Sequence, residues 1–427
     1  MKKRVLIITY YWPPSAGGGV QRWLKFSKYL PDYEWTPIIY TPDNPSYSLT
    51  DKSLLQDISP DLEVLKRPIW EPYDLVNVLK GKKSSKSLNT GQTNKSSTSS
   101  KLLSWVRGNF FIPDPRKYWV KPSVSFLKQY LKHNPVDVII TTGPPHSMHL
   151  IGLALKKAIG CKWIVDIRDP WSAFDLLDEY RVSPRNLKKY QALESEVLMA
   201  CDRVIATSPS MPTQLQSFDQ DKFLPITNGF DKSDFDLFSD TSNKRNLVLY
   251  HAGLMSDLRN PVNFWTALDQ IIGEDSVPSK YMLHLVGVVE SGVDASIQKY
   301  QHLSQCYKKE GYKDHEEVIL DYQTANVLLL FVNNTANAAV NIPGKTFEYL
   351  ATGKPILCFS KPDTDVAKIL EQFDHCAVID YNEEVPDIKE KLLAFFSSRT
   401  HATTSEVDKF SRSQLTADLA HLLDALG

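Results

Sequence analysis

Residues 4–24 read RVLIITYYWPPSAGGGVQRWL. A short apolar run, Arg4–Thr9, is followed by a loop of prolines and glycines, Pro13–Gly19, and then by an amphipathic helix that begins near Val20. The order strand, loop, helix is typical of a parallel α/β sheet. Glycines let backbone amides approach a ligand, and a helix start attracts phosphate. Because the loop lacks the dinucleotide and Walker spacings, an ordinary NAD or ATP site is disfavoured; a tight turn without a ligand is the alternative.

The same rhythm of apolar strand, loop and helix continues along the chain and restarts after residues 228–229. Continuous apolar strands that alternate with helices predict parallel sheets covered on both faces. We therefore expect an α/β protein with two doubly wound units, residues 1–222 and 223–404, and a helix over 405–427 that packs back across their junction. The predicted strands cover residues 4–9, 35–40, 136–141, 163–167 and 203–207, then 247–251, 282–289, 327–332, 355–359 and 376–380.

The composition excludes several classes of protein. A length of 427 residues suggests two or three domains, and 49 basic against 50 acidic residues leave a net charge of −1. That balance argues against a nucleic-acid binder and against an acidic disordered chain. Five scattered cysteines without a CxxC pair indicate neither a disulfide framework nor a zinc site, and they fit a reducing cytosol. No segment has the roughly 18 apolar residues of a membrane span, and the first apolar run resembles a strand more than a signal peptide.

One segment breaks the pattern. Residues 80–101 are rich in Ser, Lys, Asn and Thr, which predicts a mobile loop. The wider stretch 71–135 holds twelve basic and three acidic residues, a local charge of +9, interleaved with aromatic side chains. One hypothesis is that this stretch contacts anionic lipid; a solvated loop beside an ordinary hydrophobic turn is the alternative. The aromatic residues in question are Trp105, Phe110, Phe111 and Trp119.

Two motifs in the second unit carry charged side chains that suit a nucleotide. In residues 344–355, GKTFEYLATGKP, Lys345 and Glu348 share the first turn of a predicted helix. The ammonium would bind phosphate and the carboxylate would accept ribose hydroxyls, whereas the alternative is a surface ion pair of about 0.2–0.5 kcal/mol. In residues 251–261, HAGLMSDLRNP, Arg259 stands before a helix that begins near Pro261, so cation and helix start would converge on one anion. A solvated loop arginine is the alternative there.

Two further candidates follow strands of the first unit. His146 follows residues 141–145, TTGPP, just beyond a strand end. It is a better candidate for a site residue than His149, which falls further into the next helix. Residues 166–171, DIRDPW, place charges at a strand end, where they are costly unless paired. The alternative is an internal pair of Arg168 with Asp169 or with Asp166 that braces the loop.

Together these motifs resemble the glycosyltransferase family 4 group of GT-B enzymes. The resemblance implies two Rossmann-like domains that face a central cleft, and a nucleoside-diphosphate-sugar donor with neither cofactor nor metal. It also implies transfer with retention to a glycan or lipid-linked acceptor, in the synthesis of surface polysaccharide or glycolipid. The location would be cytoplasmic, with peripheral attachment to the inner face of the cell membrane as a hypothesis. The matching segments are residues 7–14, the glycines Gly17, Gly18 and Gly19, and residues 201–208, 226–231, 253–259 and 345–355.

The resemblance also implies roles for individual residues. Arg259 would hold the donor diphosphate together with a second cation, and Glu348 would bind the ribose. Gly17 to Gly19 and Gly253 would lie near the donor. The chain departs from the pattern at Val340, where the family has a first glutamate, and at Leu254, where it has an arginine. Lys345 would then supply the second cation.

On the acceptor side, the candidates are His146 and Asp169 as catalytic residues, with Arg168 and Trp171 beside the acceptor. No side chain stands out as a covalent nucleophile, so stabilisation of the departing diphosphate would be the main catalytic device. Two other functions stay open. Nucleotide-sugar 2-epimerases share the architecture, and a non-catalytic nucleotide-sugar-binding partner is mildly favoured by the missing glutamate at Val340.

Overall fold

The structure is a computed structural model that describes residues 3–47, 49–72, 98–243, 245–274, 280–398 and 404–427. The chain forms two compact units. Unit 1 comprises Met1–Thr227 and Arg412–Gly427, and unit 2 comprises Asn228–Ser411. Most of the predicted mobile segment 80–101 lies outside the described residues; its last four residues begin helix α3.

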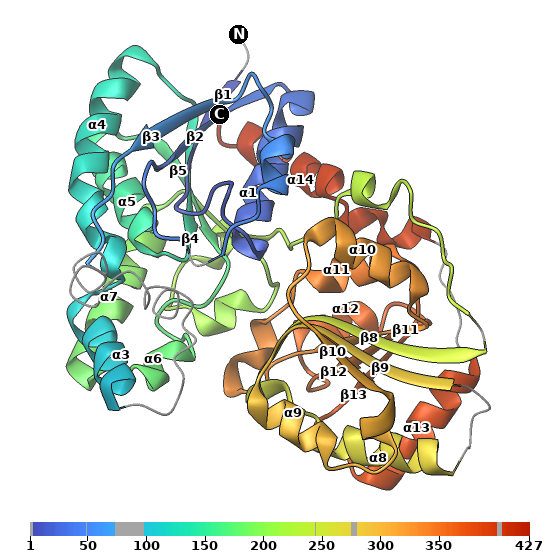
Figure 1. Ribbon diagram of the computed structural model, residues 1–427. Helices are drawn as coiled ribbons and strands as arrows, with labels where there is room; N and C mark the ends of the chain where they lie inside the picture. Colours follow the sequence, from blue (N-terminus) through green and yellow to red (C-terminus); the bar gives the residue numbers. More distant parts are fainter. Residues whose placement is uncertain (1–2, 48, 73–97, 244, 275–279, 399–403) are drawn as a thin grey trace. The chain divides into compact units, whose positions relative to one another are not determined.

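Unit 1 is built on a parallel sheet of seven strands in the order β3-β2-β1-β4-β5-β6-β7. The direction of winding reverses between β1 and β4, which is the switch point at which such sheets bind ligands. Figure 1 shows α4 and α5 on one face of this sheet and α1 with α14 on the other. The strands are β1 (Lys3–Ile8), β2 (Trp35–Pro42), β3 (Glu63–Arg67), β4 (Val138–Gly143), β5 (Lys162–Ile167), β6 (Arg203–Ala206) and β7 (Phe223–Pro225).

The helices of unit 1 cover a sheet whose central strands are fully buried. Val5 and Ile7 of β1 pack in one cluster with Trp23 and Leu24 of α1 and with Leu419 of α14. This burial, at roughly 25 cal/mol per Å² of apolar surface, fixes both helices on the sheet. The helices are α1 (Gly18–Tyr29), α3 (Thr98–Phe110), α4 (Val120–His133), α5 (Ser147–Ile159), α6 (Leu176–Glu179), α7 (Pro184–Ala200) and α14 (Arg412–Asp424).

Unit 2 repeats the topology with six parallel strands in the order β10-β9-β8-β11-β12-β13. They are β8 (Asn246–Met255), β9 (Lys280–Val289), β10 (Tyr307–Glu310), β11 (Val327–Phe331), β12 (Ile356–Phe359) and β13 (Cys376–Ile379). The helices are α8 (Val262–Gly273), α9 (Ser291–Gln298), α10 (His315–Thr324), α11 (Lys345–Ala351), α12 (Asp365–Leu370) and α13 (Val385–Ser398).

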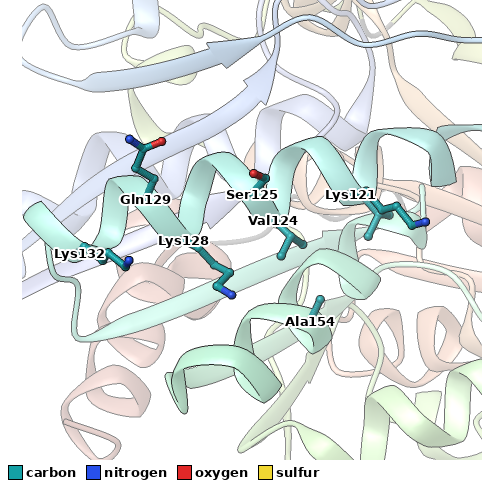
Figure 2. A pocket seen from close by; sticks show the side chains of 8 residues that line it. Lys121, Val124, Ser125, Lys128, Gln129, Lys132 and Ala154 are labelled. Carbon is teal, nitrogen blue, oxygen red and sulfur yellow. The ribbon is translucent and has the colours of Figure 1, made fainter.

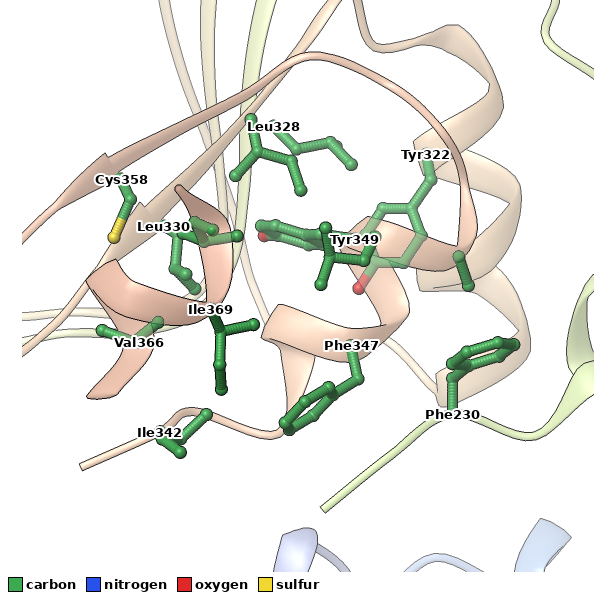
Figure 3. Packing of buried hydrophobic residues seen from close by; sticks show 14 of the residues in the cluster. Phe230, Tyr322, Leu328, Leu330, Ile342, Phe347, Tyr349, Cys358, Val366 and Ile369 are labelled. Carbon is green, nitrogen blue, oxygen red and sulfur yellow. The ribbon is translucent and has the colours of Figure 1, made fainter. Parts of the chain in front are cut away.

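Alternation along the central strand β11 builds two cores in unit 2. Leu328 and Leu330 point to one face and pack against Phe347 and Tyr349 of α11, as Figure 3 shows. Val327, Leu329 and Phe331 point to the other face, which α8, α9 and α13 cover. A strand buried on both faces needs a continuous apolar run, which is why the period-2 alternation of polar and apolar residues is absent here.

The C-terminal helix predicted over residues 405–427 is two elements. The first, the 3-10 helix η11 (Thr404–Phe410), belongs to unit 2, and α14 belongs to unit 1, where it packs on α1. The break falls at Ser411, which forms a β-bridge with Phe230. The predicted α/β class with two Rossmann-like doubly wound domains is confirmed. No helix in the described part of the chain is long and apolar enough to cross a membrane.

Candidate functional site

Lys345 is the first residue of α11 and contacts the carboxyl half of β8. Its Nζ atom donates a hydrogen bond to the carbonyl oxygen of Ala252. The next residue, Gly253, has a φ of 138°, and a Cβ atom at that position would overlap Lys345 Nζ. Only glycine therefore permits both the backbone conformation and the close approach of the ammonium.

The position of Lys345 disfavours the charged form of its side chain. Burial and the nearby Arg259 guanidinium lower the pKa of Lys345 to about 7, although the carboxylate of Glu348 acts in the opposite direction. A bound anion would raise this pKa again, because an opposite charge nearby favours the ammonium form. The group is thus poised to gain a proton when an anion binds near neutral pH.

Arg259 ends the short 3-10 helix η8 (Asp257–Arg259) and is half-buried. Its Nε donates to Asn333 Oδ1 at 2.6 Å and its Nη1 to the Leu254 carbonyl oxygen at 3.1 Å. Burial lowers the pKa of Arg259. Within the described ranges neither Arg259 nor Lys345 forms an ion pair with a carboxylate. Two half-buried cations held by neutral oxygens form a site with net positive charge, which favours an anionic ligand.

Glu348 lies one turn after Lys345 on α11 and is also half-buried. The hydroxyl of the buried Tyr322 donates to Glu348 Oε2 at 3.3 Å. Beneath this group, the fully buried His251 places its Nδ1 at 2.9 Å from the Leu329 carbonyl oxygen. Burial, and then the charge of Lys345, lower the pKa of His251 well below its usual value, so this imidazole is neutral. Val340, where the resemblance places a glutamate, is a buried apolar residue at the end of η10 (Ala336–Val340).

In unit 1, the glycine loop and the loop after β5 contact each other. Helix α1 begins at Gly18, two residues earlier than predicted, and Gly17 precedes it with a φ of 95°. A Cβ atom on Gly19 would lie only 2.5 Å from Nη1 of Arg168, so the missing side chain makes room for the guanidinium. The other end of that guanidinium donates to the Pro144 carbonyl oxygen. Gly19 and the Arg168 guanidinium are therefore in contact, although the sequence predicts Gly19 near the donor and Arg168 beside the acceptor.

His146 and Trp171 form a stacked pair beside these residues. Their ring centroids are 4.7 Å apart and the rings are inclined by 3°. Burial lowers the pKa of His146 well below its usual value, with His149 and Arg168 adding to the effect, so the ring is neutral. His149 is a core residue: it is fully buried, its Nδ1 lies 2.9 Å from Thr141 Oγ1, and its pKa falls to about 3.

The two aspartates at the carboxyl end of β5 behave differently: Asp166 lies in the strand and Asp169 in the loop that follows. Asp166 is fully buried and pairs with Arg22 at 2.9 Å, so the predicted alternative of an Arg168 partner is wrong for this residue. Asp166 also accepts hydrogen bonds from Trp23 and Thr142, which makes it a structural residue. Asp169 has no ion pair with Arg168 among the described residues, and burial raises the pKa of its carboxyl.

Comparisons with known proteins identify the fold. No family model matches the chain, and no curated protein matches its sequence. Solved structures do match: sucrose-phosphate synthase from Thermosynechococcus elongatus has a TM-score of 0.65 at 14% identity over 99% of both chains. The apo form of the lipopolysaccharide outer core galactosyltransferase WaaB has a TM-score of 0.59 at 10% identity over 99% of both chains.

The chain has the GT-B fold. A protein assigned as UDP-N-acetylglucosamine 2-epimerase from Listeria monocytogenes matches as well, with a TM-score of 0.53 at 10% identity over 100% of this chain and 96% of that one. Transferases and an epimerase thus share the architecture. At 10–14% identity these matches show the fold and not the reaction.

The structure brings the predicted residues together in two groups, one in each unit. In unit 2 the group is Gly253, Arg259, Lys345 and Glu348. In unit 1 it is Gly19, Arg168, His146 and Trp171, with Asp169 close enough for Arg168 to affect its pKa. Sequence reasoning missed Tyr322 and Asn333. Asn333 was detectable, because it follows the carboxyl end of β11, whereas Tyr322 lies within α10 and carries no motif.

Proposed function

We propose that the protein is a glycosyltransferase of the family 4 type, which transfers a sugar from a nucleoside-diphosphate-sugar to an acceptor hydroxyl with retention. The observation that carries this proposal is the pair Arg259 and Lys345. Both cations are half-buried at the carboxyl side of β8, and neither is neutralised by a carboxylate in the described part of unit 2. A diphosphate would complete this site, because its two negative charges match the two cations.

The same cations would serve the reaction itself. When the bond from the anomeric carbon to the diphosphate breaks, negative charge collects on the leaving oxygen. Arg259 and Lys345 would stabilise this charge more strongly in the transition state than in the bound substrate, which is the condition for catalysis. The acceptor oxygen bonds to the anomeric carbon, and its proton passes to the departing phosphate. No metal is required in this scheme.

Glu348 would bind the ribose of the donor. Tyr322 occupies its Oε2, while Oε1 has no protein partner among the described residues. A carboxylate oxygen held in this way accepts hydroxyl groups well, because the charged partner strengthens the hydrogen bond. On the side of unit 1, His146 and Asp169 would contact the reacting sugar, with Arg168 and Trp171 beside the acceptor.

A nucleotide-release assay separates the three candidate functions. Purified protein is incubated with UDP-, GDP- and dTDP-sugars, and both free nucleotide and sugar identity are followed. A transferase releases nucleotide, slowly to water and faster with an acceptor. An epimerase interconverts the sugar without needing an acceptor, and a binding partner does neither. Nucleotide release that depends on Arg259 and Lys345 but not on the exposed Lys299 supports the proposal.

We also propose that one surface of unit 1 contacts an anionic membrane. Aromatic rings adjoin one another there, all of them exposed except the half-buried Phe111: Trp105 packs on Phe110, and Tyr118 contacts both Phe111 and Trp70. We call these five residues the aromatic ridge. Phe110 is 61% exposed and Trp105 is 40% exposed. Exposed aromatic groups with basic neighbours are typical of membrane-surface contacts.

Helix α4 supplies basic groups in the same unit. A surface groove of about 640 Å³ between α4 and α5 is lined by Lys121, Lys128 and Lys132, with Val124 and Ala154 on its apolar floor (Figure 2). Each lysine near an anionic surface contributes about 1 kcal/mol. Membrane contact through unit 1 would suit a lipid-linked acceptor.

Vesicle flotation tests the membrane proposal. The protein should float with phosphatidylglycerol vesicles and not with neutral phosphatidylcholine vesicles. Salt at about 0.5 M should weaken the association, because it screens the charges. Trp105→Ser with Phe110→Ser should abolish flotation. Leu237→Ser is the matched control, because Leu237 is 91% exposed but lies in unit 2. Equal flotation of all variants would contradict the assignment of the aromatic ridge.

A further inference from the structure

His251 lies on β8, two residues before Gly253, and has no role in the reaction proposed above. Its side chain is fully buried. The Nδ1 atom lies 2.9 Å from the carbonyl oxygen of Leu329 on β11. Because a carbonyl oxygen only accepts hydrogen bonds, Nδ1 carries the proton of the neutral ring. The other ring nitrogen, Nε2, therefore presents a lone pair, and it has no hydrogen-bond partner among the described residues.

A buried acceptor without a partner is unusual, because nearly all buried polar atoms in folded proteins are paired. The Phe331 ring lies beside the imidazole, with ring centroids 5.0 Å apart, and has no N–H or O–H group. The carbonyl oxygen of Leu254 acts on the pKa of His251, but it too can only accept. Of the groups that act on this imidazole, only the cations Lys345 and Arg259 have N–H groups to donate.

Lys345 is the better placed of the two cations. Its charge has the larger effect on the pKa of His251. A Cβ atom on Gly253 would overlap Lys345 Nζ and would lie 3.7 Å from His251 Nε2. Both nitrogens therefore border the same small space, which exists because residue 253 is a glycine. Arg259, by contrast, already donates to two neutral oxygen atoms.

The ammonium group of Lys345 has enough donors for this contact. An ammonium has three N–H groups, and one of them goes to the Ala252 carbonyl oxygen. An anion between Lys345 and Arg259 would take a second, which leaves the third for His251 Nε2. Because lysine has a flexible four-carbon stem, Nζ can turn toward the imidazole without movement of the backbone.

A neutral acceptor suits this position better than a carboxylate would. A carboxylate would favour the charged lysine, but it would also cancel that charge and repel a phosphate. Burial, and then the charge of Lys345, lower the pKa of His251 well below its usual value, which keeps the ring neutral. The other charged groups that act on this pair are Arg259 on η8 and Glu348 on α11. The imidazole can thus pair with the ammonium while the site stays positive.

We propose that His251 is a positioning residue: its Nε2 accepts a hydrogen bond from the Lys345 ammonium and holds that group toward the donor diphosphate. The imidazole itself does not touch the donor. It fixes the direction of the ammonium and favours its protonated form, so that the cation is in place before the bond to the diphosphate breaks. This inference rests on the proposed transferase function and adds a residue on which the donor site depends.

Two variants of His251 distinguish a positioning role from a purely structural one. The side-chain N–H of asparagine reaches the position of Nδ1, so His251→Asn keeps a donor for the Leu329 carbonyl and removes the acceptor at Nε2. His251→Gln reaches further, places an amide oxygen near the position of Nε2 and keeps the acceptor. His284→Asn is the matched control, because His284 is a buried histidine of β9 that pairs instead with Glu310 at 3.0 Å.

The first measurement is the titration of Lys345 in the unliganded protein, followed through its Cε resonance by ¹³C NMR and assigned with Lys345→Arg. The midpoint should fall by about one pH unit in His251→Asn, because the ammonium loses its acceptor. It should stay close to the wild-type value in His251→Gln and in His284→Asn.

The second measurement is the dissociation constant at pH 8 for UDP, GDP or dTDP, whichever the wild-type protein binds most tightly. Binding should weaken about tenfold in His251→Asn and recover in His251→Gln. In a Lys345→Ala background, His251→Asn should have no further effect, because the group that it positions is absent.

The outcomes separate this inference from the transferase proposal. If a donor is turned over but His251→Asn leaves the Lys345 titration or the nucleotide affinity unchanged, the inference is wrong and the transferase proposal stands. A loss in His251→Gln as large as that in His251→Asn also overturns it, since that result indicates a structural role. Where His251→Asn does not fold, His251→Gln decides alone: it must retain the wild-type titration of Lys345. If that titration shifts in His251→Asn and returns in His251→Gln while no nucleotide binds, the transferase proposal fails and the pairing remains.

Discussion

The ammonium group of Lys345 donates a hydrogen bond to the carbonyl oxygen of Ala252. This contact joins α11 to β8 next to Gly253, and it places the lysine close enough to Arg259 for the guanidinium to lower its pKa. Two cations at one edge of a parallel sheet are unfavourable without an anion between them. Because Arg259 disfavours the charged form of Lys345, an anionic ligand between them should increase the protonation of Lys345.

Donor affinity should therefore depend on pH. The pKa of Lys345 is about 7 in the unliganded protein, so the ammonium is largely protonated below pH 7 and increasingly neutral above it. We expect the dissociation constant for UDP, or for whichever nucleotide binds, to be constant below pH 7 and to rise up to about tenfold per pH unit above it. Calorimetry in buffers of different ionisation enthalpy should show proton uptake on binding at pH 8.

Lys345→Arg provides the control for this pH effect. The guanidinium keeps its charge throughout the range, because its pKa is about 12 or higher. Its nucleotide affinity should be nearly independent of pH between 6 and 9, whatever its absolute value. A wild-type affinity that is equally flat would show that Lys345 is not the titrating group.

Gly253→Ala should disrupt the site and the fold locally. An alanine at a φ of 138° is strained, and its Cβ would overlap the Lys345 ammonium. We expect a loss of about 1–3 kcal/mol in the free energy of unfolding, together with weaker nucleotide binding. Urea denaturation measures the first and calorimetry the second. Gly311→Ala is the matched control, because a Cβ atom there meets nothing within 4 Å.

The buried pair Arg22–Asp166 should be important for stability. Both side chains are fully buried, and Asp166 also accepts from the Trp23 indole at 2.7 Å. Replacing Asp166 by Ala leaves the guanidinium buried without its partner, which should cost about 3–5 kcal/mol. Glu196→Ala removes the exposed partner of Lys157 and should cost at most about 1 kcal/mol in the same urea titration. Similar losses for the two variants would contradict this account of Asp166.

His146 should matter for turnover and not for nucleotide binding. The ring is neutral and stacks on Trp171, and the proposed reaction places this side chain against the reacting sugar. We expect His146→Ala to lower kcat by about 10²-fold or more while the dissociation constant for the nucleotide stays unchanged. The exposed His421 serves as the control. Unchanged kcat in His146→Ala would reduce this residue to a structural role, and the same comparison applies to Asp169→Asn.

The central strands could be predicted from sequence because burial on both faces demands continuous apolar runs. Strands β3, β7 and β10 were missed, and each lies at or near the edge of its sheet. Strand β10 reads YKKE and is half-exposed, so no apolar run marks it. Strand β3 reads EVLKR and has the same character. Edge strands form because a neighbouring strand offers hydrogen bonds, which is information that the local sequence does not contain.

The sequence indicated candidate residues for the site but not their arrangement. Lys345 and Glu348 were indicated by their spacing in the first turn of a helix, Arg259 by its place before a helix start, and all three by the family resemblance. The partner of Asp166 was not predictable, since Arg22 lies on a helix that is distant in sequence. The same is true of the division at Ser411, because the apolar spacing of residues 405–426 fits one continuous helix.

The most direct test of the central claim compares nucleotide release by the wild-type protein, Arg259→Ala, Lys345→Ala and the double variant. The donor should be the nucleotide-sugar that the wild-type protein turns over fastest, and Lys299→Ala is the control. Each single variant should lower kcat by about 10²-fold, and the double variant by more. Turnover in the double variant equal to that of the wild type would contradict the claim that these two cations bind and activate the donor diphosphate.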